Sequence, residues 1–153
     1  MRVWRIFKAI HKASAFTGQG AHQYGGRWNS HGHAVVYASQ SLSLAVLELL
    51  VHLKDFALLR RGYLCRLVEV DESLIEIWTA PLPSGWRKPN HPALPAIGDL
   101  WIGQARSAAL LVPSAVVPAE NNLLLNPNHP GFGQIKMLDE YTLEMDERLL
   151  EIR

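Results

Sequence analysis

The chain has 153 residues, 48% of them hydrophobic and 19% charged, and its formal net charge is +1 at pH 7. This size and composition are typical of one soluble globular domain that folds without cross-links. The near-zero charge argues against a general nucleic-acid binder, whose surface would carry a basic patch or stripe.

The cysteine content and the lengths of the apolar runs indicate the compartment. Cys65 is the single cysteine and cannot form an internal disulfide, so we expect a cytoplasmic protein. It lies in a strand-like run, and we interpret it as a small core residue rather than a nucleophile. No apolar run reaches the about 18 residues of a membrane span, and the first residues lack the apolar stretch of a signal peptide. We therefore expect no membrane partner.

The first residues of the chain predict a strand, a helical turn and a loop. Residues 3–8 alternate apolar and polar side chains, which indicates a strand, and residues 9–16 are expected to form a short helical turn. Residues 17–33 contain five glycines and three histidines and are predicted to form a long polar loop. Because loops of this length inside a compact domain are usually functional or mobile, this segment is a candidate for the site.

A strand and an apolar helix follow the loop. Residues 34–38 predict a short strand, and Ser39 and Ser41 offer N-caps for a helix from about residue 42 to residue 55. Apolar side chains form two stripes along this helix. We therefore expect the helix to be largely buried.

The second half of the chain mixes strands, one helix and an irregular segment. Five prolines between residues 81 and 95 predict irregular structure, and a helix is expected from about residue 97 to residue 109. Strands are predicted at residues 62–70, 74–78, 109–112, 115–117, 122–125 and 141–145, with a turn at 71–72 and a break at Pro113. Since these elements lack a regular βαβ rhythm, we predict a single α+β domain over residues 1–153, with a mixed or antiparallel sheet and flanking helices.

The most informative segment is Tyr-Gly-Gly-Arg-Trp-Asn at residues 24–29. It places the Arg27 guanidinium beside glycines that tolerate unusual backbone angles and close approach. The guanidinium fork suits phosphate and carboxylate groups, so the segment resembles a loop that holds an anion. The alternative is that Arg27 only bridges the loop to the surface of the domain. Trp28 is interpreted as a core or loop-anchoring residue.

Glu48 is the second informative residue, because it lies in the middle of the apolar helix. An unpaired ionised carboxylate is unfavourable there, so Glu48 must reach a cleft, pair with a cation or shift its protonation. A carboxylate at a cleft is a common catalytic group. The alternative is an exposed stripe on which Glu48 pairs with Lys54 or water. His52, one turn later, is interpreted as a cap or a packed side chain.

Two other residues are weaker candidates for the functional site when each is considered alone. Tyr37 stands in the strand before the Glu48 helix, and Ser114 follows Pro113 at a strand break, where a hydroxyl could face a cleft. His31 and His33 are the one close histidine pair, but no metal-binding motif is present, and no metal is expected. The segment Gly18-Gln19-Gly20 does not continue into a dinucleotide-binding fingerprint, and no P-loop is present.

Several ordered motifs resemble the RES-domain family, which is named for an arginine, a glutamate and a serine. The resemblance spans about residues 4 to 150. The motifs are Trp4-Arg5-Ile6, Gly18-Gln19-Gly20-Ala21, residues 24–29, Val35-Val36-Tyr37-Ala38-Ser39, Leu44-Ala45-Val46-Leu47-Glu48, Gly98-Asp99-Leu100-Trp101, Val112-Pro113-Ser114-Ala115-Val116 and Leu124-Leu125-Asn126-Pro127-Asn128-His129-Pro130. The first glycine-rich piece departs from the family, which often has an acid where this chain has Gln19.

The resemblance implies specific roles. The three eponymous residues fall on Arg27, Glu48 and Ser114, and the active-site tyrosine of the family falls on Tyr37. Arg27 would hold a phosphate of the substrate, Glu48 would stabilise positive charge on the ribose, Tyr37 would contact the nicotinamide, and Ser114 would orient the ribose or amide. Weaker expectations for substrate binding are Trp28, Asn29 and Asn126.

The resemblance also implies an activity and a partner. The family has a fold like that of ADP-ribosyltransferase toxins, cleaves NAD⁺ at the nicotinamide–ribose bond and is neutralised by an antitoxin with a helix-turn-helix domain. NAD⁺ would be a substrate, with water or inorganic phosphate as acceptor, and no bound cofactor is expected. Transfer of ADP-ribose to a protein is one alternative. A non-catalytic nucleotide- or partner-binding module and an RNase toxin are the others, and the near-neutral charge argues against the RNase.

Overall fold

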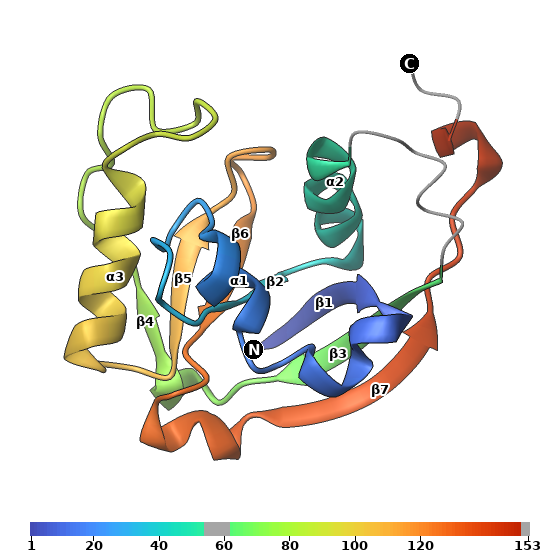
Figure 1. The fold of residues 1–153 in the computed structure, drawn as a ribbon, viewed down its shortest axis with the longest axis horizontal. Helices are drawn as coiled ribbons and strands as arrows, with labels where there is room; N and C mark the ends of the chain where they lie inside the picture. The colour runs from blue at the N-terminus through green and yellow to red at the C-terminus, as the bar shows by residue number, and fades with distance from the viewer. Residues whose placement is uncertain (54–61, 151–153) are drawn as a thin grey trace.

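The computed structural model describes residues 1–53 and 62–150. These residues form a seven-stranded sheet in the order β4-β5-β6-β2-β1-β3-β7 (Figure 1). Only β4 and β5 are parallel, and the remaining neighbours are antiparallel. The prediction of an α+β fold with a mixed sheet is therefore confirmed. The strands are β1 (Arg2–Lys8), β2 (Val36–Ser39), β3 (Tyr63–Glu69), β4 (Ile75–Ile77), β5 (Ala109–Pro113), β6 (Asn121–Leu125) and β7 (Lys136–Thr142).

Helices of different lengths pack around this sheet. The α-helices are α1 (Gln19–Tyr24), α2 (Leu42–His52) and α3 (Leu94–Gln104), and short 3-10 turns cover Ala9–Ser14, Glu72–Leu74, Pro130–Gln134 and Glu147–Leu150. In Figure 1, α3 lies beside the β4–β5 end of the sheet, whereas α2 lies beside β1. None of the helices in the described ranges has the length and apolar character needed to cross a bilayer.

The sheet is nearly split between β1 and β2. These strands share a single registered pair, Trp4 with Ser39, whereas β1 and β3 pair along their whole length. Arg5 occupies the place where the backbones separate, and its Nη1 donates to the carbonyl of Tyr37 at 2.8 Å. Its Nε donates to the carbonyl of Ala15 at 2.6 Å. A side chain therefore satisfies a β2 carbonyl where the strands diverge, and the separation leaves room for a cavity.

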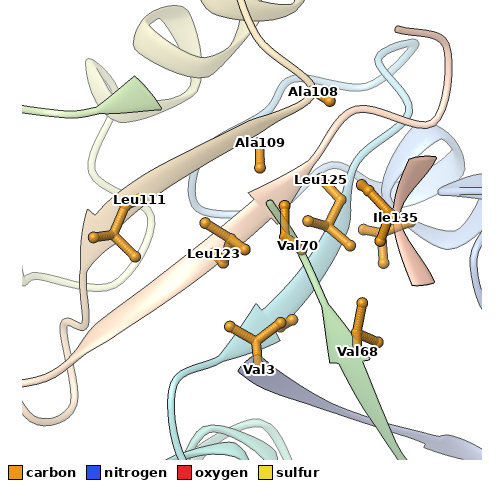
Figure 2. Packing of buried hydrophobic residues seen from close by; sticks show 11 residues of the cluster. Val3, Val68, Val70, Ala108, Ala109, Leu111, Leu123, Leu125 and Ile135 are labelled. Carbon is orange, nitrogen blue, oxygen red and sulfur yellow. The ribbon is translucent and has the colours of Figure 1, made fainter. Parts of the chain in front are cut away.

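Two hydrophobic clusters bury both faces of β5 and β6. In β6, Leu123 and Leu125 face one cluster and Leu124 faces the other, as the alternation of side chains in a strand requires. Figure 2 shows the first cluster, in which Val3 and Val68 from β1 and β3 meet residues of β5 and β6. The second cluster lies under α3 and the loop that carries Trp28. This double burial explains the almost continuous apolar sequence of β5 and β6.

Helix α2 begins where the sequence predicted but is less buried than expected. Its N-cap is Ser41, whose Oγ accepts from the Leu44 amide at 3.0 Å. Only Leu44 and Ala45 are buried, while Leu47 and Val51 keep 40% and 59% of their surface exposed. The expectation of a largely buried helix is wrong, because within the described ranges α2 packs mainly on β1 and β2 and leaves several apolar side chains exposed. The helix ends at His52, and the predicted residues 54 and 55 lie outside the described ranges.

Helix boundaries differ from the prediction in two places. The segment 17–33 contains α1, which follows Gly18 at a φ of 70° and buries none of its residues, so no apolar periodicity marks it. Helix α3 covers Leu94–Gln104 instead of 97–109. It starts early because Pro95 fits the first turn, and it stops where Ala105 adopts a φ of 45°.

Two strand predictions are also wrong. Residues 115–117 form a bend, because the amides of Val116 and Val117 both donate to Ser114 Oγ at 3.0 Å instead of to a neighbouring strand. The last strand covers 136–142 rather than 141–145, since β7 pairs along the edge of β3. Residues 71–72 do start a turn, but β3 and β4, which it connects, lie far apart in the sheet.

Candidate active site

The Arg27 segment is a tight turn that only glycine permits at two positions. The Gly26 amide donates to the carbonyl of Asn29 at 2.9 Å, which closes the turn around Arg27 and Trp28. Gly25, at the end of α1, has a φ of 70°. A Cβ on Gly26 would lie 2.6 Å from the Tyr37 hydroxyl. The two glycines therefore set the backbone angle and admit a tyrosine directly beneath the turn.

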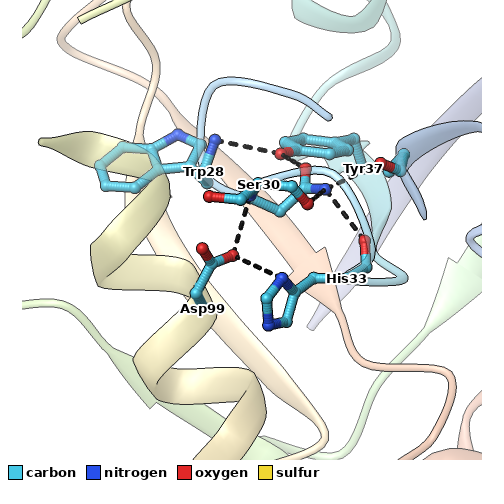
Figure 3. A network of polar contacts seen from close by, with 7 residues as sticks. Trp28, Ser30, His33, Tyr37 and Asp99 are labelled. Carbon is cyan, nitrogen blue, oxygen red and sulfur yellow. Dashed lines mark hydrogen bonds and ion pairs between the residues drawn. The ribbon is translucent and has the colours of Figure 1, made fainter. Parts of the chain in front are cut away.

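Tyr37 and Asn29 hold the turn through hydrogen bonds, and Figure 3 shows Tyr37 beside Trp28. The Tyr37 hydroxyl donates to Asn29 Oδ1 at 2.6 Å and accepts from the Trp28 amide at 3.1 Å. Asn29 is 1% exposed, and its Nδ2 donates to three backbone carbonyls, those of Ala21, Ser30 and His33. Burial is the main reason why the pKa of Tyr37 is raised above its usual value. Both residues thus support the loop. Because Tyr37 and Asn29 also line cavities beside Arg27, their contact with substrate stays a prediction.

Helix α3 holds the turn from the side. Asp99 Oδ1 accepts from the Ser30 amide at 2.8 Å and lies 3.3 Å from His33 Nδ1. The preceding residue, Gly98, packs against the Trp28 backbone, where an added Cβ would lie 1.7 Å from the carbonyl oxygen. Trp28 itself is buried in the second core cluster. Gly98 and Asp99 therefore fix the position of the turn relative to α3.

Arg27 both bridges two loops and lines the cavity. Its Nη1 donates to the carbonyls of Trp86 and Lys88 at 2.9 and 3.2 Å, which is the bridging arrangement that the sequence left open. No hydrogen bond from the described residues engages Arg27 Nε or Nη2. The guanidinium is thereby fixed at one edge while other donors remain for an anion.

Glu48 lines the cavity, and one of its carboxylate oxygens is held in place by two hydrogen bonds. Its Oε1 accepts from Ser114 Oγ at 2.7 Å and from Asn122 Nδ2 at 2.6 Å. Ser114 Oγ already accepts from two backbone amides, so its own hydrogen is directed to Glu48. Ser114 is fully buried and does not line the cavity. Ser114 therefore orients the carboxylate rather than touching the cavity.

The site is an open cleft with two connected lobes. The inner lobe, of about 370 Å³, is lined by Tyr37, Glu48, Asn122 and the Arg27 turn. The outer lobe, of about 750 Å³, extends over the irregular segment before α3. Five of the described residues line both lobes: Gly25, Gly26, Arg27, His52 and Ala115. Within residues 1–53 and 62–150, Glu48 is the one acidic residue that lines either lobe.

Arg5 lines the inner lobe and was not selected from the sequence. Burial lowers its pKa to about 10, so it remains charged at neutral pH. Its guanidinium lies 5.8 Å from the Phe16 ring centroid and bonds backbone carbonyls, and no carboxylate of the described residues pairs with it. The one feature of the sequence that could have identified Arg5 is its place inside a strand of largely apolar residues. A partly buried cation that has no counter-ion among the described residues attracts an anionic ligand.

The other predicted residues are placed as follows. Asn126 follows the far end of β6, lines neither lobe and accepts from the Asn128 amide through its Oδ1 at 3.0 Å. Cys65 is buried and unpaired in β3. No group of three or more potential metal ligands occurs within residues 1–53 and 62–150. Asn122, which sequence reasoning missed, stands at the polar start of an otherwise apolar strand.

Comparisons with known proteins find similar sequences over most of the chain. A family model described as RES domain matches residues 2–146. The chain is 44% identical over 133 residues to a Yersinia enterocolitica protein named Toxin Res, covering 86% of this chain and 88% of the relative. It is 42% identical over 139 residues to a Sphingobium protein named Prs ADP-ribosylating toxin, covering 87% and 86%.

A solved structure shares the fold. A chain in the crystal structure of the M. tuberculosis MbcT–MbcA toxin–antitoxin complex superposes with a TM-score of 0.76 and 19% sequence identity. The match covers 93% of the present chain and 83% of that chain. At this identity the likeness establishes the architecture, not the chemistry.

Proposed function

The chain belongs to the RES-domain family, and we propose that it is a toxin that cleaves the nicotinamide–ribose bond of NAD⁺. One arrangement carries the proposal. A carboxylate, with one of its oxygens fixed by hydrogen bonds, lines a cleft that two arginines also line. Glu48, Arg5 and Arg27 all line the inner lobe. A dinucleotide with a cationic glycosidic centre and a pyrophosphate matches that charge pattern.

The proposed reaction assigns a role to each wall of the cleft. The bond between ribose C1′ and the nicotinamide nitrogen breaks, and nicotinamide leaves with the electron pair. Positive charge develops on the ribose, and Glu48 stabilises it electrostatically. Arg27 and Arg5 hold the phosphates, so the ribose is positioned against Glu48. Water or inorganic phosphate then adds to C1′, and the rest of the dinucleotide extends into the outer lobe.

Transfer of ADP-ribose to a protein is the second candidate. The observation that favours it is the similarity to the relative named Prs ADP-ribosylating toxin. Both reactions share the bond cleavage and differ in the acceptor. The openness of the cleft toward the outer lobe, lined by Tyr24, His31 and Arg87, gives a macromolecular acceptor a route to the ribose.

The partner proposed for this toxin is an antitoxin with a helix-turn-helix domain. A fold shared with a chain from a toxin–antitoxin complex supports this partner. The natural contact would be the rim of the cleft, because covering it would exclude NAD⁺. Tyr24 lies on that rim and is 80% exposed.

The direct test is release of nicotinamide from NAD⁺ by the purified protein, with and without phosphate. We expect turnover that Arg27→Ala and Glu48→Gln each reduce by at least about a hundredfold, a typical loss for a group that stabilises transition-state charge. Arg106→Ala and Glu76→Gln are matched controls, because these residues form an exposed ion pair with each other at 2.8 Å, away from the cleft.

The outcomes separate the candidate functions. Full turnover by both Arg27→Ala and Glu48→Gln would refute the site. A phosphate-dependent product identifies phosphorolysis, whereas label from adenine-labelled NAD⁺ on a protein identifies transfer. Binding of NAD⁺ without nicotinamide release indicates a non-catalytic module. Degraded cellular RNA with constant NAD⁺ in growth-arrested cells indicates the RNase alternative.

A further inference from the structure

We propose that Asn122 is a positioning residue that holds Glu48 in its reactive orientation, and that Ser39 in turn holds Asn122. This inference rests on the proposed function. The family's eponymous residues account for one donor to Glu48, the Ser114 hydroxyl, but the structure shows a second, shorter contact from Asn122. Unlike Ser114, Asn122 lines the cleft beside the carboxylate.

The hydrogen bonds fix the direction of the amide. A carboxylate only accepts, so Asn122 must turn its Nδ2 toward Glu48 and its Oδ1 away. That Oδ1 accepts from Ser39 Oγ at 2.7 Å. Ser39 and Asn122 are cross-strand partners in the β2–β6 ladder, and Ser39 also forms the one registered pair with β1. The amide is therefore anchored at the point where the two parts of the sheet join.

The two donors act on a single oxygen. Ser114 and Asn122 both reach Oε1, and no hydrogen bond from the described residues reaches Oε2. Rotation of the carboxylate would break both hydrogen bonds at once, so Ser114 and Asn122 together fix the plane of the carboxylate. We infer that Oε2 is presented to the ribose in a fixed direction, which is the preorganisation that electrostatic catalysis requires.

The neighbouring asparagine provides a matched control. Asn121 Nδ2 donates to Gln40 Oε1 at 3.0 Å, and Asn121 does not line the cleft. Asn121→Ala and Asn122→Ala therefore remove the same side chain from adjacent positions of β6, but only Asn122→Ala removes a donor to Glu48.

The first measurement separates kcat from KM for nicotinamide release. Loss of one hydrogen bond to a charged group predicts a fall in kcat of roughly ten- to a hundredfold for Asn122→Ala, with KM nearly unchanged. Ser39→Ala should give a smaller fall in kcat, because the amide keeps its donor but loses its anchor. Asn121→Ala should retain wild-type kcat. A kcat for Asn122→Ala equal to that of Asn121→Ala would overturn the proposal.

The second measurement is the pH profile of Asn122→Asp. A second carboxylate next to Glu48 makes the two groups titrate as a coupled pair, and like charges this close cannot both ionise easily. The acid side of the kcat profile should move to higher pH. Among the described residues, the other titratable or charged groups that line the inner lobe are Arg5 on β1, Arg27 on its turn, Tyr37 on β2 and His52 on α2, and none of these residues is substituted in this variant. An unshifted profile would count against the contact.

An activity-independent measurement distinguishes failure of this inference from failure of the proposed function. In ligand-free protein labelled with ¹³C at glutamate side-chain carboxyls, the Glu48 signal, assigned with Glu48→Gln, should shift in Asn122→Ala but not in Asn121→Ala. If wild-type protein releases no nicotinamide but the signal shifts, only the proposed reaction fails. If the signal does not shift, Asn122 does not hold Glu48.

Discussion

At the scale of single residues, the proposed catalytic groups are held by side chains whose hydroxyl groups already make hydrogen bonds within the protein. Ser114 accepts from two amides and donates to Glu48, so its hydroxyl is a fixed support and not a nucleophile. The Tyr37 hydroxyl is similarly occupied by Asn29 and the Trp28 amide. Arg27 and Glu48 differ from these supports, because each still has polar atoms without a hydrogen bond from the described residues.

Tyr37→Phe tests the supporting role of the hydroxyl. The change leaves Asn29 Oδ1 and the Trp28 amide without their partner, so we expect the free energy of unfolding to fall by about 1–3 kcal/mol near neutral pH. Urea unfolding monitored by circular dichroism measures this difference. Wild-type stability in Tyr37→Phe would show that the hydroxyl does not hold the turn.

The same variant should show a pH dependence of defined sign. Burial raises the pKa of folded Tyr37 above its ordinary value of 10.0, so the unfolded chain releases this proton first. The stabilising contribution is complete below that value and declines as pH rises toward the folded pKa. The stability difference between wild type and Tyr37→Phe should therefore be smaller at about pH 11 than at about pH 8. Tyr63 and Tyr141, whose pKa values are also raised, are common to both proteins and cancel.

At the scale of elements, α3 serves as the rigid wall against which the Arg27 turn is placed. Asp99 accepts the Ser30 amide, and Gly98 lets the Trp28 backbone approach the helix. The turn also carries Trp28 into the core beneath α3. A loop fixed by a helix, a core tryptophan and a half-buried tyrosine can hold a guanidinium in one place without a ligand, which reduces the ordering needed on binding.

Gly98→Ala and Gly103→Ala test this packing within one helix. Alanine is favoured over glycine in a helix by up to about 1 kcal/mol, so both variants would gain stability if only propensity mattered. At Gly98, however, the new Cβ would lie 1.7 Å from the Trp28 carbonyl oxygen, whereas at Gly103 nothing lies within 4 Å. We expect Gly98→Ala to lower both the urea midpoint and nicotinamide release. Gly103→Ala should preserve nicotinamide release and keep the urea midpoint at or above the wild-type value. Equal midpoints for the two variants would contradict the packing.

At the scale of the whole molecule, the cleft lies at the junction of β1 and β2, where the sheet has the fewest paired residues. One registered pair joins β1 to β2, and the residues of the inner lobe come from both sides of that junction: Arg5 and Trp4 from β1, Tyr37 and Ser39 from β2, and Asn122 from β6. A ligand bound there would contact both parts of the sheet and α2. Binding should therefore stabilise the entire fold.

NAD⁺ should raise the unfolding temperature of a variant that binds it without consuming it. Glu48→Gln is suitable because the amide oxygen can still accept from Ser114 and Asn122. At a hundred times the dissociation constant, the expected stabilisation is about 2.7 kcal/mol. The double variant Glu48→Gln, Arg27→Ala should gain much less at the same NAD⁺ concentration. Equal gains, measured by differential scanning calorimetry, would show that Arg27 does not contact the dinucleotide.

The sequence by itself determined the features that depend on neighbouring residues. The types of most strands and helices followed from apolar periodicity, the N-cap of α2 from Ser41, and the loop around Arg27 from its glycines. The sequence also identified Glu48 as a carboxylate in an apolar helix, where an unpaired charge is unfavourable. Helix α1 escaped prediction because it buries no residue and so leaves no periodic pattern.

Only the tertiary structure decided which groups meet. Glu48 receives its donors from residues 66 and 74 positions later in the chain, and Arg27 bonds carbonyls 59 and 61 positions away. Such contacts depend on strand order and on the separation of β1 from β2, which local patterns do not encode. For the same reason Arg5 and Asn122 were recognised only in the fold, where burial and shared hydrogen bonds give ordinary side chains a defined position in the cleft.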